Sequence, residues 1–309
     1  MFPLQVVRQN GQKKASFSVQ LDELLAVVEE RFYFLAYFPE TDFVLESLWS
    51  SVIRLLCEDS LHVHFVPDRA EQFRENYLAA KDFLDRFVRL YSAPQNDFAH
   101  TFWKHPATKT FMDKWSLPVY YQVRFLEIAT PVESCFALPV HTESSENGFR
   151  LNMTAIVWSA IERCWSYEVC LPELVHRFWK LTCLILARYH AWLKQLDTQQ
   201  DSLIPDILAD LSVLRSRTSS LPSEYVSKFL GTEEKRIAVL SAVLQESIAD
   251  SLRPLNDIQQ QFLERLAMTA AEHAMEIVRA VQEIPRLYRH TNRDVRLNQA
   301  IVAYTNLLP

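Results

Sequence analysis

The chain has 309 residues, of which 49% are hydrophobic and 23% are charged, and its net charge is −6 at pH 7. This balance is typical of a folded protein, and it excludes an extensively disordered chain or one that attracts nucleic acid through its overall charge. Only three glycines are present, so a glycine-rich phosphate loop, a dinucleotide-binding turn and a nucleophile elbow are excluded, because each needs several glycines close together.

Three stretches early in the chain carry apolar residues at helical spacing, after an irregular lead segment over residues 1–20. They are residues 21–35, 44–55 and 70–91, where apolar side chains recur every three or four positions. In the third stretch seven such residues share one face: Ala70, Phe73, Tyr77, Ala80, Leu84, Phe87 and Tyr91. We expect this face to be core, since burying five large apolar side chains contributes roughly 8–15 kcal/mol before entropy is subtracted. The alternative is an exposed face that binds another subunit.

The middle of the chain adds a proline-initiated helix and a polar loop. Pro118 suits the first turn of a helix that runs to about Phe136, with a kink or a division at Pro131. Residues 139–148 are rich in Thr, Ser, Glu and Asn, which predicts a flexible loop over 137–150.

Further helical patterns fill the rest of the chain, and we expect the first two to be thoroughly buried. They cover residues 155–165, 174–196, 207–214, 237–248 and 255–284. Pro254 predicts the end or a sharp kink of the fourth helix, and Pro285 predicts the end of the last. With no convincing strand pair, the sequence predicts an all-α fold, with an N-terminal helical bundle over 21–136 and a C-terminal bundle over 151–309.

Two residue pairs at helical spacing resemble parts of metal sites. Glu173 and His176 have the Glu-x-x-His spacing of di-iron bundles, but such a site needs a second pair and two further glutamates, and the sequence has no second pair. Asp206 and Asp210 lie one helical turn apart, as in magnesium-binding helical synthases, but the adjacent double aspartate is missing. We therefore expect both pairs to lie on polar, solvated helix faces, and we expect no metal and no cofactor.

Histidines and cysteines offer no stronger candidate. His62 and His64 would point the same way on a strand, but without a third ligand nearby we expect a pair in a loop. Five cysteines include no CxxC pair, and their odd number argues against a complete disulfide framework: Cys57, Cys135, Cys164, Cys170 and Cys183. Because no apolar run reaches the roughly 18 residues of a spanning helix, we expect a soluble cytosolic protein with reduced thiols and only peripheral membrane contact.

A cluster of arginines stands out near the C-terminus. It comprises Arg279, Arg286, Arg289, Arg293 and Arg296. Arginines on one surface hold acidic partners or phosphoinositide headgroups, with about 1 kcal/mol per charge near an anionic membrane. The alternative is that Arg286 and Arg289 neutralise the C-terminus of the preceding helix, and we favour this role, alone or combined with such binding.

Three longer blocks resemble one family. The first block, Lys114–Ala129, reads KWSLPVYYQVRFLEIA. The second begins at Leu171, reads LPELVHRFWKLT and continues to LARY at Leu186–Tyr189. The third block, Ile284–Arg293, reads IPRLYRHTNR. In order and rough spacing these blocks resemble the family of subunit 2 of the conserved oligomeric Golgi complex. The resemblance covers about 114–293, and none of the blocks is a chemical motif.

This resemblance implies an elongated rod of stacked helical bundles, as in multisubunit tethering complexes, and no catalysis. It implies retrograde vesicle tethering at the cytoplasmic face of Golgi membranes. The partners that it implies are the other subunits of the complex, with SNAREs, Rab proteins and golgins as further partners, but no nucleic acid. The family's subunit is longer, with an N-terminal coiled-coil region that has no counterpart here, so we expect an internal or truncated piece. The alternatives are an unrelated all-helical cytosolic adaptor and an all-helical metal-dependent enzyme.

Overall fold

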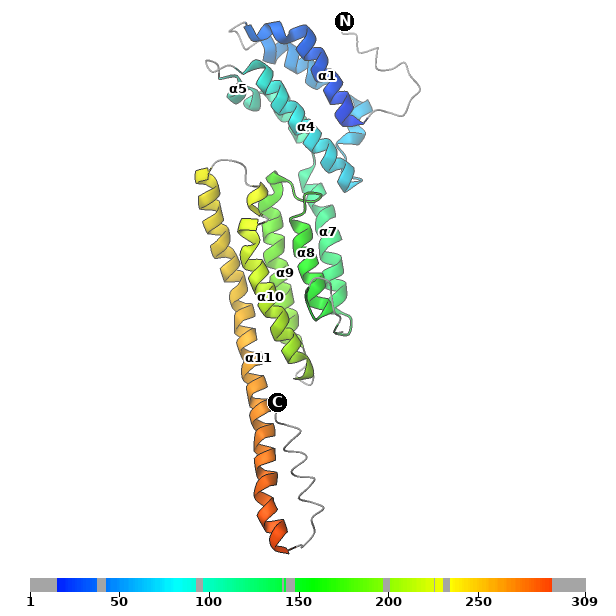
Figure 1. Ribbon diagram of the computed structural model, residues 1–309. Coiled ribbons are helices and arrows are strands. Elements are labelled where there is room, and N and C mark those ends of the chain that lie inside the picture. The colour runs from blue at the N-terminus through cyan, green and yellow to red at the C-terminus, as the bar shows by residue number, and fades with distance from the viewer. Residues whose placement is uncertain are drawn as a thin grey trace. The chain divides into compact units, whose positions relative to one another are not determined.

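The computed structural model describes residues 16–37, 43–92, 97–140, 142, 148–196, 201–224, 226–229 and 234–290. Most of these residues are helical, and the β interaction among them is an isolated bridge between Thr142 and Leu151. The predicted all-α fold is therefore confirmed (Figure 1).

The α-helices are α1 (Phe17–Phe32), α3 (Ser50–Leu56), α4 (Ala70–Tyr91), α5 (Phe98–Lys104), α6 (Pro106–Asp113), α7 (Leu117–Phe136), α8 (Asn152–Cys164), α9 (Val175–Gln195), α10 (Ile204–Glu224) and α11 (Glu234–His290). The 3-10 or π-helical segments are η2 (Tyr33–Tyr37), η3 (Val44–Trp49), η4 (Asp59–His64), η5 (Pro172–Leu174), η6 (Asp201–Leu203) and η7 (Val226–Phe229).

The chain forms two compact units, each built from segments that are separated in sequence. Unit 1 comprises residues 1–130 and 163–179, and unit 2 comprises residues 131–162 and 180–309. The predicted boundaries of the lead segment, the two bundles and the loop between them stay a prediction. Residues 1–15 and 143–147, which belong to the predicted lead segment and loop, lie outside the described residues.

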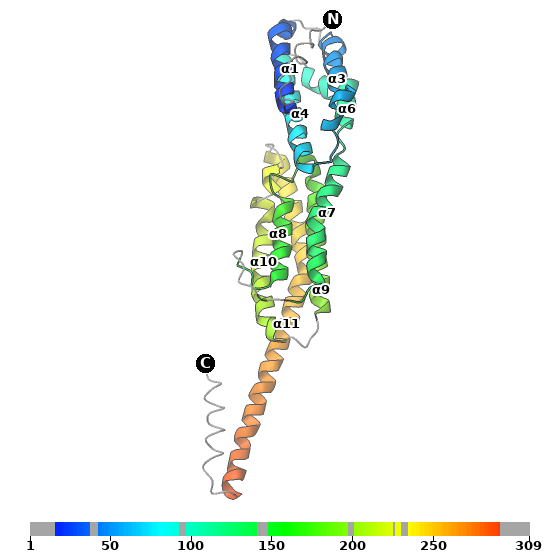
Figure 2. The same ribbon diagram turned by 90° about the vertical axis from the view of Figure 1, so that its right-hand side faces the viewer.

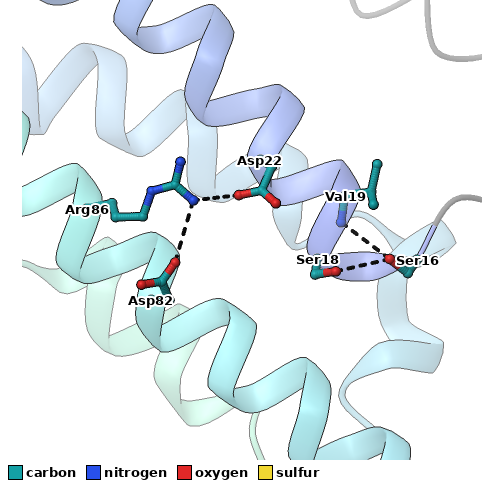
Figure 3. Close-up of polar contacts among 6 residues, drawn as sticks. All are labelled: Ser16, Ser18, Val19, Asp22, Asp82 and Arg86. Atoms are coloured by element: carbon teal, nitrogen blue, oxygen red, sulfur yellow. Dashed lines mark hydrogen bonds and ion pairs between the residues drawn. The ribbon is translucent and has the colours of Figure 1, made fainter.

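In unit 1, α1 and α4 lie side by side (Figures 1 and 2). The Ser16 hydroxyl caps α1 by accepting a hydrogen bond from the Val19 backbone N–H, and Arg86 of α4 pairs with Asp22 of α1 (Figure 3). All seven residues of the predicted stripe on α4 are buried. The prediction that this face is core is confirmed, and the alternative of an exposed partner-binding face is wrong.

Aromatic side chains fill much of the core of unit 1. The Trp49 ring is fully buried, and its centroid lies 4.6 Å from that of Phe87 and 4.6 Å from that of Phe102. The Trp49 indole N–H donates to the Thr108 hydroxyl at 2.8 Å, so the buried indole nitrogen has a hydrogen-bond partner. Because aromatic pairs add about 0.5–1.5 kcal/mol beyond the area they bury, this cluster joins η3, α4, α5 and α6 firmly.

Unit 2 contains α10, α11 and most of α8 and α9. The hydroxyls of Thr154 on α8 and Tyr189 on α9 share a buried hydrogen bond of 2.8 Å. Trp192 of α9 stacks on Phe136 at a ring distance of 5.5 Å. In both views α11 lies alongside α10 and then continues beyond the N-terminal end of α10 (Figures 1 and 2).

Three prolines that were expected to interrupt helices do not end them. α7 continues through Pro131, and α11 runs without a break through Pro254 and Pro285. The division at Pro131 and the helix ends at Pro254 and Pro285 are therefore wrong, while the kinks that were the alternatives at Pro131 and Pro254 stay predictions. A proline removes one backbone hydrogen bond, and the buried side chains of Leu252 and Leu255 on either side of Pro254 hold the helix in place there.

Candidate interaction surface

The packed part of α11 is short compared with the helix. With 57 residues at about 1.5 Å each, α11 is roughly 85 Å long. Among the side chains of α11 that the structure describes, residues 238–279, the buried ones lie in one stretch: Ile248, Leu252, Leu255 and Ile258. This spacing of three and four residues places them on one face, and the side chains of residues 259–279 are exposed or half-buried.

The same face continues along α11 after the packed stretch ends. Gln259, Phe262, Leu266 and Thr269 are half-buried and extend the spacing of three and four residues. Other large apolar side chains on this part of the helix are exposed, among them Met268 at 65%. The projecting part of α11, residues 259–279, therefore carries a half-buried stripe that includes Phe262 and Leu266.

The predicted arginine cluster begins on this same helix. Arg279 is exposed on α11. Arg286 and Arg289 fall within the bounds of α11, where 3.6 residues per turn brings positions 279, 286 and 289 within about 80° of one another. Nothing in the structure describes the side chains of Arg286 and Arg289, and Arg293 and Arg296 lie outside the described residues. The cluster therefore stays a prediction, and so does the neutralisation of the helix end, which lies at His290 rather than before Pro285.

Glu173 takes part in the packing of unit 1, whereas the His176 side chain is exposed. Glu173 lies in η5 and His176 in the first turn of α9. The Glu173 carboxylate forms an ion pair with Lys81 at 3.3 Å. Burial, and after it the nearby Glu173 carboxylate, raises the pKa of Tyr77 above its usual range. Across the described ranges, no group of three or more His, Cys, Asp or Glu side chains is placed to hold a metal ion.

Asp210 differs from the sequence-based expectation. Its side chain is 1% exposed, and its two oxygens accept the backbone N–H groups of Arg150 at 2.7 Å and Leu151 at 2.9 Å. Burial raises the pKa of the Asp210 carboxyl, while these two hydrogen bonds act in the opposite direction. Asp206 binds the Arg150 guanidinium at 2.8 Å. The prediction of a solvated face is wrong for Asp210, which instead fixes the chain where α8 begins.

The structure also describes the surroundings of the histidine pair, His62 and His64, and of the five cysteines. His64 ends η4, so the expected loop pair lies in a 3-10 turn, and its ring stacks on Phe17 at 4.7 Å. All five cysteines are free thiols. Burial raises the pKa of Cys135 to about 11 and that of Cys170 to about 12. Because the thiolate is the nucleophile, these two groups are poor catalysts at neutral pH.

A buried arginine explains much of the first family-like block. Arg124 on α7 is 1% exposed, and its guanidinium donates to the Tyr120 hydroxyl, to the Glu168 carbonyl and to the Glu127 carboxylate, the last at 2.8 Å. The Tyr120 hydroxyl in turn donates to the Val169 carbonyl at 2.6 Å. These bonds attach the segment 163–179 to α7 within unit 1. Position 124 lies one helical turn after position 120 on the buried face of α7. A charged residue at the spacing of buried apolar residues is the feature of the sequence that could have indicated a buried charge.

Residues 113–298 match the family described as "COG complex component, COG2, C-terminal". The match includes α7 with its buried arginine and the whole projecting part of α11. The chain belongs to the COG2 family. Membership removes the alternative of an unrelated adaptor.

Curated COG2 relatives agree with this assignment. The human protein named "Conserved oligomeric Golgi complex subunit 2" is 27% identical over 301 residues, which are 83% of this chain and 40% of that protein. The Drosophila melanogaster protein of the same name is 31% identical over 281 residues, 84% of this chain and 38% of that protein. The chain therefore spans about 40% of the length of these relatives. No solved structure matches.

Proposed function

We propose that the chain is a non-catalytic part of a Golgi vesicle-tethering complex, acting in intra-Golgi retrograde transport and Golgi organisation through protein–protein contacts. The observation that carries this proposal is the COG2 family match over residues 113–298, which spans the region with the buried Arg124 and the half-buried stripe on α11. Both curated relatives above are named as subunits of the conserved oligomeric Golgi complex. The geometry is compatible with such a role, since Glu173 is held in an ion pair and Asp210 in two hydrogen bonds to backbone N–H groups.

The partners that follow from this proposal are the other subunits of that complex, with SNAREs, Rab proteins and golgins as further binding partners. The location that follows is the cytoplasmic face of Golgi membranes, in peripheral association. Within the described segments, none of the helices combines the length and the apolarity that crossing a bilayer requires. A rod of stacked bundles is the shape that we propose for this role.

Affinity isolation of the complete protein tests the central proposal. We expect other subunits of the complex to be recovered in stoichiometric amounts, and we expect fluorescence microscopy to place the protein at the Golgi. Recovery of no other subunit, together with diffuse staining, would contradict the assignment. A stoichiometric metal ion in the purified protein would instead favour the enzyme alternative.

The arginine cluster is proposed as the contact for a phosphoinositide-containing membrane. The double variant R289E/R293E should weaken sedimentation with vesicles that contain a phosphoinositide by at least about tenfold, since each basic residue contributes about 1 kcal/mol near an anionic surface. R215E/R253E is the matched control, because it makes the same total change in charge at two exposed arginines outside the cluster. Equal binding by the two variants would leave neutralisation of the helix end as the role of Arg289.

A further inference from the structure

We draw no further inference here: the strongest candidate, the half-buried stripe with Phe262 and Leu266 on the projecting part of α11, carries none, because nothing in the described part of the chain shows what covers it.

Discussion

α4 and the projecting part of α11 have similar sequence patterns and opposite surroundings. Both carry apolar side chains every three or four residues, yet Phe87 on α4 is fully buried whereas Phe262 and Leu266 on α11 are only half-buried. α4 lies against α1 and the aromatic cluster around Trp49, while α11 continues beyond the helices that cover its middle. Periodicity therefore specifies a helix and its apolar face, and the tertiary structure decides whether that face is core or contact surface.

The largest expected effect is a loss of stability when one apolar side chain is truncated to alanine, and it should differ between α4 and the projecting part of α11. Phe87→Ala should lower the free energy of unfolding by about 3–5 kcal/mol, because it leaves a cavity among Trp49, Phe102 and Tyr91. Leu266→Ala should cost less than about 1 kcal/mol in the isolated chain, because Leu266 is only half-buried. Urea titrations followed by tryptophan fluorescence and by circular dichroism measure both. Equal losses would show that the stripe on α11 is core in solution.

A smaller loss of stability should distinguish a buried arginine from an exposed one. Arg124→Ala should destabilise the protein by about 2–4 kcal/mol, since the Glu168 carbonyl and the Tyr120 hydroxyl each lose a donor. The matched variant Arg188→Ala removes a guanidinium that pairs with Glu133 at the surface, and it should cost about 0–1 kcal/mol. Thermal unfolding measures the two side by side. Similar costs for the two variants would contradict the structural role of Arg124.

The smallest effect concerns thiol reactivity, which reports on packing outside α11. We expect iodoacetamide to modify Cys183 first and Cys57 more slowly at neutral pH, because both are half-buried and burial raises the pKa of the Cys57 thiol. Cys135 and Cys170 should stay unmodified until the protein unfolds. Peptide mass spectrometry after timed labelling gives the order, and rapid labelling of Cys170 would contradict the packing of unit 1.

The same raised pKa values predict sensitivity to alkali. In the unfolded chain Cys135 and Cys170 ionise near their ordinary value of 9.0, whereas in the folded protein they hold their protons up to about 11 and 12. The protonated thiols therefore contribute stability that is complete below about pH 9 and is lost as the pH rises toward 12. A flat unfolding free energy across this range would contradict the burial of these groups.

Much of the fold was predictable, because helical periodicity is a local property. The stripe on α4 and the start of α7 near Pro118 followed from spacing and from proline chemistry. The continuation of helices through Pro131 and Pro254 did not, because packing on both sides of a proline offsets the missing hydrogen bond and is invisible in a short window of sequence.

The polar groups were harder to predict than the apolar ones. Asp206 and Asp210 have the same residue type and lie on the same helix, yet Asp210 is buried against two backbone N–H groups some 60 positions earlier in the chain. Such partners come together only through tertiary contacts. For the interaction surface, the arginine cluster was visible as composition, whereas the stripe beyond Ile258 required knowing where the packing of α11 ends.

The interleaving of the two units has a consequence for biosynthesis. The chain passes from one unit to the other three times, after residues 130, 162 and 179. During translation, unit 1 lacks its last segment until residue 179 has left the ribosome, by which time part of unit 2 has already been made. Neither unit can be released by a single proteolytic cut, so an expression fragment that ends near residue 150 would leave the Tyr120 hydroxyl without the Val169 carbonyl that it binds.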